Sequence, residues 1–177
     1  MEIIIREIDM DTQLHFGQCD SSFTVNSKLI LYAENERISY TVVDVPPCTK
    51  KYDAHQTDFA EYASDPDKTI FLAYMNNEIA GQVRVTKYWN QYALIDDFVV
   101  DTKHRRQGVG RLLIARAIEW AKTSGFPGVT LETQNINVAA SLLYESCGFE
   151  LRGFDTHLYK GLNPATEEIA LFWYLIF

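Results

Sequence analysis

Basic side chains are scarce in this sequence of 177 residues. It has 16 lysines and arginines against 24 aspartates and glutamates, which gives a formal net charge of −8 at pH 7. Proteins that bind nucleic acids generally need a basic surface to displace the counterions of the phosphate backbone. We therefore expect no nucleic-acid partner. The same negative charge would attract a cationic ligand.

Long apolar runs are also lacking. The start, "MEIIIREID", has a short apolar run broken by Glu2 and Arg6, and the C-terminal run "ALFWYLIF" is far too short to span roughly 30 Å of hydrocarbon. We therefore expect no signal peptide, no membrane-spanning segment and no membrane partner. The 3 cysteines, Cys19, Cys48 and Cys147, form no CxxC pair. An odd, scattered set without an export signal indicates reduced thiols in a cytoplasmic protein.

Residue patterning predicts one domain, residues 1–177, with a mixed α/β sheet, because no linker or internal repeat divides the chain. β-branched and aromatic runs between Thr69 and Asp101 are separated by short polar turns, which predicts an antiparallel meander. Helical spacing predicts helices in "GRLLIARAIEWAKTSG" and "NVAASLLYESCG". Further strands are predicted at "EIIIREI", "RISYTVVDV", "GVTLETQ", "ELRGFDTHLYKG" and "EEIALFWYLIF".

Two segments are harder to interpret. The stretch between the first strand and "RISYTVVDV" is mixed and compatible with a helix. Residues 46–68 open with Pro-Pro, close with Asp-Pro-Asp and carry five acidic side chains. This composition predicts a loop with a short helix.

A basic cluster, "HRRQGVG" at residues 104–110, follows a predicted strand and opens a predicted helix. The first turn of a helix offers unpaired N–H groups and partial positive charge to an anion. Glycines allow close approach to the backbone, and arginines add charge and hydrogen bonds. Leu113 stands where a dinucleotide-binding GxGxxG turn would need its third glycine, and no GxxxxGK[ST] string is present. A pyrophosphate laid across one helix start suits the pattern, and a solvated turn is the alternative.

This loop resembles the signature [RQ]xxGx[GA] of the GCN5-related N-acetyltransferase (GNAT) family. "NVAASLLYESCGFE" resembles the family's later motif, an Asn-x-x-Ala helix followed by Tyr-x-x-x-Gly-Phe. The resemblance implies the GNAT fold, a mixed, mostly antiparallel central sheet flanked by helices, and acetyl-CoA as cosubstrate. It implies that the end of the strand "IDDFVVD" binds the pantetheine arm through its backbone and that the loop binds the pyrophosphate. The implied cofactor-binding residues are Phe98, Val99, Val100, Arg105, Arg106, Gln107, Gly108, Val109, Gly110, Arg111, Asn137, Ala140 and Tyr144.

Tyr144 is the predicted catalytic acid. Asn137, Ala140 and Tyr144 fall on one helical face. A phenol with a pKa of about 10 is protonated at neutral pH and can give its proton to a thiolate whose conjugate acid has a pKa near 8.5. Packing of the tyrosine in the core is the competing interpretation, and the position within the family motif favours the catalytic one.

The predicted base is a carboxylate. An alkylammonium with a pKa of about 10.4 must lose a proton before it attacks. Asp96 and Asp97 are expected to point to opposite faces of their strand, so that one faces the acceptor. Resemblance of this strand to polyamine acetyltransferases favours Asp96, which would need a raised pKa or a water relay. The alternative is that both aspartates only bind a cationic substrate, and Glu132 is a second candidate base.

A second resemblance is to the streptothricin acetyltransferases, through "YWNQYALIDDFVV", "LETQNINVAASLLYESCGF" and "EEIALFWYLIF". It runs from about Thr69 to the C-terminus and implies acetylation of an amino group in the β-lysine moiety of streptothricin, which detoxifies the antibiotic. The predicted substrate-binding residues are Trp89, Asp96, Asp97 and Glu132. Charge and aromatic content alone leave polyamines, aminoglycosides and basic peptides open as acceptors. A non-catalytic acetyl-CoA sensor is another alternative.

Two further expectations concern metal and assembly. The histidines lack metal-ligand spacing, so we expect no metal site. Exposed strands near the C-terminus are compatible with a homodimer, the commonest closed assembly.

Overall fold

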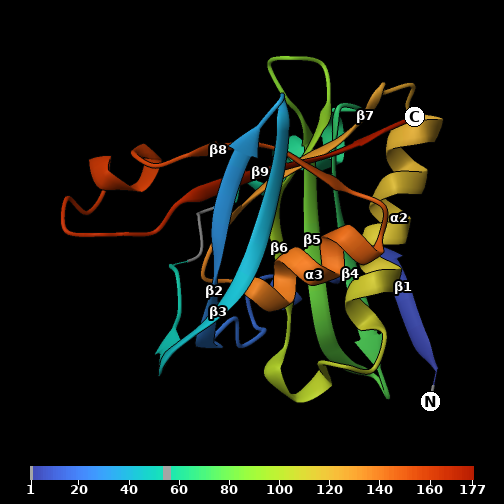
Figure 1. Cartoon of the computed structure of the whole chain (residues 1–177). Helices are drawn as coiled ribbons and strands as arrows, with labels where there is room; N and C mark the ends of the chain where they lie inside the picture. Colours follow the sequence, from blue (N-terminus) through green and yellow to red (C-terminus); the bar gives the residue numbers. More distant parts are fainter. Residues whose placement is uncertain (1, 54–56) are drawn as a thin grey trace. The chain divides into compact units, whose positions relative to one another are not determined.

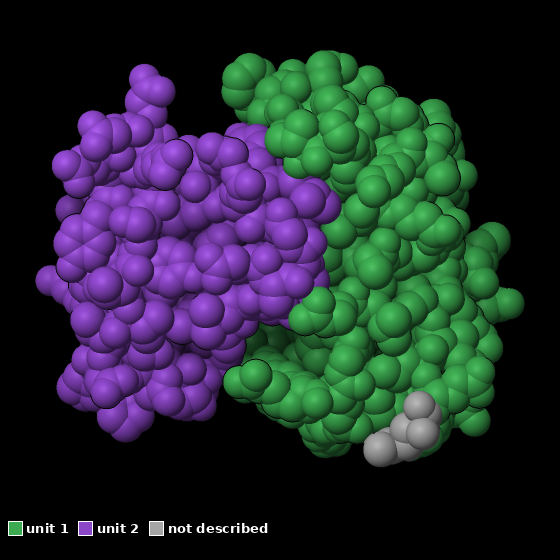
Figure 2. All heavy atoms as spheres, turned by 45° about the vertical axis from the view of Figure 1, so that its right-hand side comes forward, with its two compact units in different colours: residues 1–22, 51–129, 176–177 green, residues 23–50, 130–175 purple. Residues whose placement is uncertain are grey.

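The computed structural model describes residues 2–53 and 57–177. Residues 54–56, part of the predicted acidic loop, lie outside the described residues. The chain groups into two compact units, coloured separately in Figure 2. Unit 1 contains residues 1–22, 51–129 and 176–177, and unit 2 contains residues 23–50 and 130–175. Organisation of residues 1–177 as one domain stays a prediction.

Unit 1 is built on four antiparallel strands in the order β1, β4, β5, β6 (Figure 1). The last three form the meander that the sequence predicted. Asn76 and Asn77, in the turn between β4 and β5, have φ angles of 52° and 65°, the positive values that a tight hairpin turn requires. The strand bounds are Ile3–Glu7 for β1, Lys68–Met75 for β4, Glu78–Lys87 for β5 and Ala93–Val100 for β6.

Two α-helices belong to unit 1. The first, α1 (Phe59–Ser64), is the short helix predicted within the acidic segment. The second, α2 (Val109–Thr123), packs against β4 and β5 through an apolar face. Its buried side chains recur at helical spacing, as the sequence predicted: Val109, Leu113, Ile114, Ala117 and Ala121. Short 3₁₀ turns lie at Gln13–His15 (η1) and Thr102–His104 (η2).

Unit 2 contains a long hairpin, a helix and three further strands. The hairpin pairs β2 (Phe23–Glu34) with β3 (Arg37–Lys50) in antiparallel fashion, and β9 lies between β7 and β8. The remaining bounds are Gly128–Gln134 for β7, Val138–Ser146 for α3, Glu150–Asp155 for β8, Leu158–Gly161 for η3 and Ala170–Ile176 for β9.

The hairpin corrects two expectations. Residues 23–34 form a strand and not a helix. Buried Val25 and Leu29 stand four residues apart, a spacing that fits either element, and pairing with β3 decides the outcome. β3 also continues through Pro46 and Pro47, where we expected a loop. The register shifts there, with Val25 opposite Cys48 and Ser27 opposite Asp44, and such irregularities accommodate proline because no ladder N–H is needed.

No helix in the described ranges is long and apolar enough to cross a membrane.

Candidate active site

The start of α2 has the features of an anion site. Its N-cap is Gly108, with φ 91°, and neither a side-chain cap nor an acidic residue occupies its first turn. The other two α-helices in the described residues are capped by side chains, α1 by Asp58 and α3 by Asn137. Because the first N–H groups of a helix need partners, the uncapped start of α2 is suited to an external anion.

The predicted phosphate loop is attached to the end of β6. Arg105 donates from Nε to the carbonyl oxygen of Val100 over 3.0 Å. Arg106 is exposed and has a φ of 62°, a left-handed conformation that few non-glycine residues adopt. Gln107 donates to the carbonyl of Lys103 over 3.1 Å. Unit 1 therefore brings together the strand end and the loop that the sequence assigned to the cofactor.

Asp101 fixes the beginning of this loop, a role that sequence reasoning missed. Its buried carboxylate accepts from the backbone N–H groups of Asp20 and Lys103, each over 2.9 Å. Burial would raise the pKa of Asp101, but these hydrogen bonds and the nearby charges of His104 and Lys103 outweigh it, and the pKa lies below its ordinary value. Asp101 is thus held as a carboxylate that orders the turn after β6.

Gly81 is a second residue that sequence reasoning missed. A β-carbon at this position of β5 would lie 2.8 Å from the carbonyl oxygen of Val99 and 2.9 Å from a methyl carbon of Leu113. Only glycine therefore allows β5, the end of β6 and α2 to pack this closely. The available signal was a glycine inside a strand pattern, which often marks a close backbone approach.

The two aspartates do not follow the expected alternation. β6 has a bulge at Asp96, since Arg84 pairs with Asp97 and Val85 pairs with Ile95. The extra residue interrupts the two-residue repeat. Asp97 accepts from Gln82 over 2.5 Å, and Asp96 accepts from Arg84 over 2.7 Å.

Both carboxylates consequently reach the same face of β5. Gln82 and Arg84 are two residues apart in that strand and share a face. The expectation that Asp96 and Asp97 point to opposite faces is wrong, because it assumed a regular strand.

Asp96 is held by an ion pair with a buried partner. Its side chain is 27% exposed, whereas that of Arg84 is 8% exposed. Burial raises the pKa of Asp96 above its ordinary value, although the guanidinium of Arg84 opposes the shift. The raised pKa is the property that the sequence argument required of a base at this position.

Trp89 lies in the turn that precedes the strand carrying these carboxylates. It is 80% exposed in the turn between β5 and β6, where its ring packs edge-on against Tyr88. This turn precedes β6, whereas the phosphate loop follows it, so Trp89 stands at the opposite end of that strand from the loop.

Unit 2 carries the other predicted residues. Asn137 caps α3 by accepting from the N–H of Ala140 over 3.3 Å. Tyr144 is 5% exposed, and its ring contacts those of Phe149 and Trp173, with centroid distances of 6.1 and 6.4 Å. The ring is therefore a core residue, and the catalytic role of its hydroxyl stays a prediction.

Glu132 projects away from the core of unit 2. It is exposed between buried Leu131 and Thr133 on β7, and the hydroxyl of Tyr159 donates to its carboxylate over 2.7 Å. Nearby, Asn135 is 4% exposed and bonds through its side chain to the carbonyl of Leu29 and to the N–H of Ile169. Asn135 thus fixes the turn that connects β7, which carries Glu132, to α3, which Asn137 caps.

Comparison with known proteins agrees with this geometry. The model of the acetyltransferase (GNAT) family matches residues 32–149. The chain belongs to the GNAT family. It is 37% identical to streptothricin acetyltransferase A of Bacillus subtilis, over 92% of this chain and 93% of the relative.

Two crystal structures extend the similarity across the whole chain. One is a Bacillus anthracis protein assigned as a streptothricin acetyltransferase and crystallised with acetyl coenzyme A. It is 46% identical, with a TM-score of 0.92, over 99% of this chain and 100% of that one. The other is nourseothricin acetyltransferase, 31% identical with a TM-score of 0.82, over 98% of each chain. The predicted GNAT fold and the prediction of an acetyl-CoA-dependent N-acetyltransferase are confirmed.

Proposed function

We propose that this GNAT enzyme acetylates an amino group of the β-lysine moiety of streptothricin and so inactivates the antibiotic. The observation that carries the proposal is the extent of the similarity to the B. subtilis streptothricin acetyltransferase, which spans 92% of the chain. The family model covers only residues 32–149. Similarity to this relative outside residues 32–149 favours streptothricin as the acceptor over other amines.

In this proposal the pyrophosphate of acetyl-CoA lies at the first turn of α2. The uncapped Gly108 and the exposed side chains of Arg106 and Arg111 support that placement, because a helix start and guanidinium groups both favour phosphate oxygens. The pantetheine arm would contact the backbone at the end of β6. The complete proposed set is Phe98, Val99, Val100, Arg105, Arg106, Gln107, Gly108, Val109, Gly110, Arg111, Asn137, Ala140 and Tyr144.

The acceptor nitrogen would attack the thioester carbon directly, and the carbon–sulfur bond would break without a covalent enzyme intermediate. A backbone N–H at the end of β6 would stabilise the oxyanion. Tyr144 would donate its hydroxyl proton to the departing thiolate, since a phenol with a pKa of about 10 remains protonated at neutral pH.

Carboxylates would bind the cationic acceptor and remove its proton. Asp96, Asp97 and Glu132 are the proposed residues, with Trp89 as an aromatic contact. The raised pKa of Asp96 supports its assignment as the base, because a general base works best when its pKa approaches the working pH.

Thiol release from acetyl-CoA tests the proposal. The purified protein is assayed with streptothricin, spermidine, an aminoglycoside and a basic peptide, and we expect release with streptothricin. Release with spermidine but not with streptothricin would overturn the proposed acceptor. Absence of release with every amine would favour a cofactor-binding sensor over an enzyme.

A further inference from the structure

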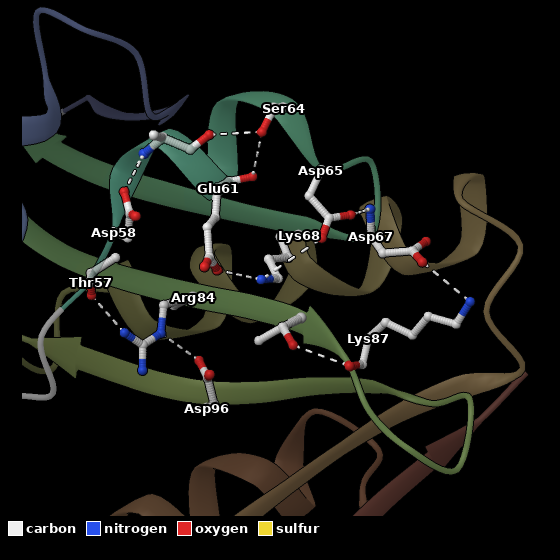
Figure 3. A network of polar contacts seen from close by, with 12 residues as sticks. Thr57, Asp58, Glu61, Ser64, Asp65, Asp67, Lys68, Arg84, Lys87 and Asp96 are labelled. Atoms are coloured by element: carbon white, nitrogen blue, oxygen red, sulfur yellow. Dashed lines mark hydrogen bonds and ion pairs between the residues drawn. The ribbon is translucent and has the colours of Figure 1, made fainter.

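Arg84 is a buried cation that contacts two separate segments of unit 1. It is buried in the middle of β5. Its Nε donates to Asp96 on the β6 bulge, and its Nη1 donates to the hydroxyl of Thr57, two residues before α1, each over 2.7 Å (Figure 3). A buried charge is unfavourable unless it is paired and hydrogen-bonded, and these contacts meet that requirement.

The helix α1 is docked on β4 at several points. Phe59 and Tyr62 pack against the cluster formed by Ile70, Leu72 and Tyr74. Asp58 caps the helix by accepting from the N–H of Ala60 over 3.0 Å. The contact between Thr57 and Arg84 is therefore one of several that determine where α1 begins.

Most carboxylates of the acidic segment are already engaged by lysines. Lys68 lies 2.5 Å from Glu61 and 3.8 Å from Asp65, and Lys87 lies 3.2 Å from Asp67 (Figure 3). These pairs neutralise much of the charge that the sequence suggested for attracting a cationic acceptor. Asp96 is also ion-paired, with Arg84, but its side chain remains 27% exposed, so part of this carboxylate is accessible to an ammonium group.

Asp96 is bonded to Arg84 through one of its carboxylate oxygens. Oδ1 accepts the hydrogen bond from Arg84. Tyr62 of α1 lies close enough for the charges of both Asp96 and Arg84 to affect its phenol, whose pKa is raised chiefly by burial. Asp96, Arg84 and Thr57 thus form one hydrogen-bonded series between β6 and the start of α1.

We propose that Arg84 is a positioning residue that ties the acceptor-binding carboxylate of Asp96 to Thr57 and α1, so that one guanidinium holds both sides of the acceptor site. The proposal rests on the proposed acetylation of a cationic amine. It predicts that Arg84 acts on acceptor binding through Asp96 and through α1, without contacting acetyl-CoA.

Hydrogen–deuterium exchange tests whether Arg84 holds Thr57 and α1 in place, and it does not depend on enzyme turnover. Arg84→Met removes both hydrogen bonds of the guanidinium, and Thr57→Val removes one while preserving shape. We expect amide exchange in residues 57–64 to accelerate by about tenfold in Arg84→Met and by less in Thr57→Val. A tenfold change matches the free energy that one hydrogen bond to a charged group contributes to the stability of a segment. Unchanged exchange in both variants would overturn the proposal.

Steady-state kinetics tests the functional consequence. In Arg84→Met the KM for streptothricin should rise by about tenfold or more, on the same grounds, while the KM for acetyl-CoA stays within about twofold. The double variant Arg84→Met/Thr57→Val should be no worse than Arg84→Met, because Thr57 acts through Arg84. Additive effects of the two substitutions, or equal changes in both KM values, would contradict a positioning role.

Arg116→Lys is the matched control. Arg116 pairs with Glu119 over 2.9 Å on α2 and stacks over the ring of Phe71 at 4.5 Å; lysine keeps the positive charge for both contacts, so the change should be tolerated in both assays. If the wild-type protein releases no thiol with any amine, the proposed function fails, and the exchange experiment still decides whether Arg84 ties the two segments.

Discussion

The Nε atom of Arg105 lies 3.0 Å from the carbonyl oxygen of Val100, so the first arginine of the phosphate loop is bonded to the last residue of β6. The sequence assigned both residues to acetyl-CoA, Arg105 to the pyrophosphate and Val100 to the pantetheine arm. Their hydrogen bond means that the two proposed contacts are not independent. A change that displaces the end of β6 should also displace the phosphate loop. Four variants test the residues around the contact between Arg105 and Val100 and the role of Tyr144.

Gly81→Ala should weaken acetyl-CoA binding and lower the free energy of unfolding. The added methyl carbon would lie 2.8 Å from the carbonyl of Val99, which cannot move without shifting β6. Overpacking of this kind typically costs about 1–3 kcal/mol. Chemical denaturation and calorimetric titration with acetyl-CoA would measure both effects. Gly161→Ala is the control, because nothing lies within 4 Å of its added carbon; equal behaviour of the two variants would refute the close-packing argument.

Gly110→Glu should weaken acetyl-CoA binding by about fivefold to nearly a thousandfold. It places a carboxylate in the first turn of α2, where the pyrophosphate is proposed to lie. Repulsion between unit charges at 4 Å amounts to about 1–4 kcal/mol, depending on the effective dielectric. Ala115→Glu adds the same charge at an exposed position of α2 and should bind normally. Retained affinity in Gly110→Glu would show that the pyrophosphate binds elsewhere.

Tyr144→Phe should lower kcat by about 10²-fold or more, the usual range for removing a general acid. The ring packing against Phe149 and Trp173 would be kept, so the affinity for acetyl-CoA should change by no more than severalfold. Steady-state kinetics and calorimetric titration separate the two quantities. Tyr32→Phe, at a position that is 51% exposed, serves as the control. A normal kcat in Tyr144→Phe would remove this hydroxyl from the mechanism.

Asp101→Asn should lower the free energy of unfolding at pH 7 by about 1–3 kcal/mol, because a buried hydrogen-bonded acceptor loses its charge. The folded pKa of Asp101 lies below the unfolded value of 3.8. Its contribution is therefore fully present above that value and is lost as the pH falls through the folded pKa.

The difference between wild type and Asp101→Asn should accordingly shrink below about pH 4. Urea denaturation at pH 7 and at several acidic values would measure it. Asp11→Asn, which removes an exposed carboxylate, should stay within about 0.5 kcal/mol of wild type. A difference that stays constant down to the lowest pH would contradict the ionised role of Asp101.

Patterns of neighbouring residues were sufficient to predict α2 and the hairpin between β4 and β5. The apolar repeat of α2 and the turn at Asn76 and Asn77 are encoded in neighbouring residues. Residues 23–34 and the strand through Pro46 were not predictable in this way, because their structure depends on pairing between β2 and β3 and on a bulge.

In the candidate site, too, motifs of neighbouring residues were predictable, whereas contacts between distant segments were not. The loop at residues 104–110 and the α3 motif were recognisable because each has a fixed spacing. The orientation of Asp96 depends on a bulge set by distant partners, and the contacts of Arg84 and Asp101 join segments far apart in the sequence. No local pattern contains that information, whereas the glycine in the β5 pattern was a usable signal for Gly81.

The most direct test of the proposed function is the structure of the product formed from streptothricin and acetyl-CoA by the purified protein. Nuclear magnetic resonance of that product should place one new acetyl group on an amino nitrogen of the β-lysine moiety, with an equivalent amount of coenzyme A released. Unmodified streptothricin, or an acetyl group elsewhere on the antibiotic, would contradict the proposed function.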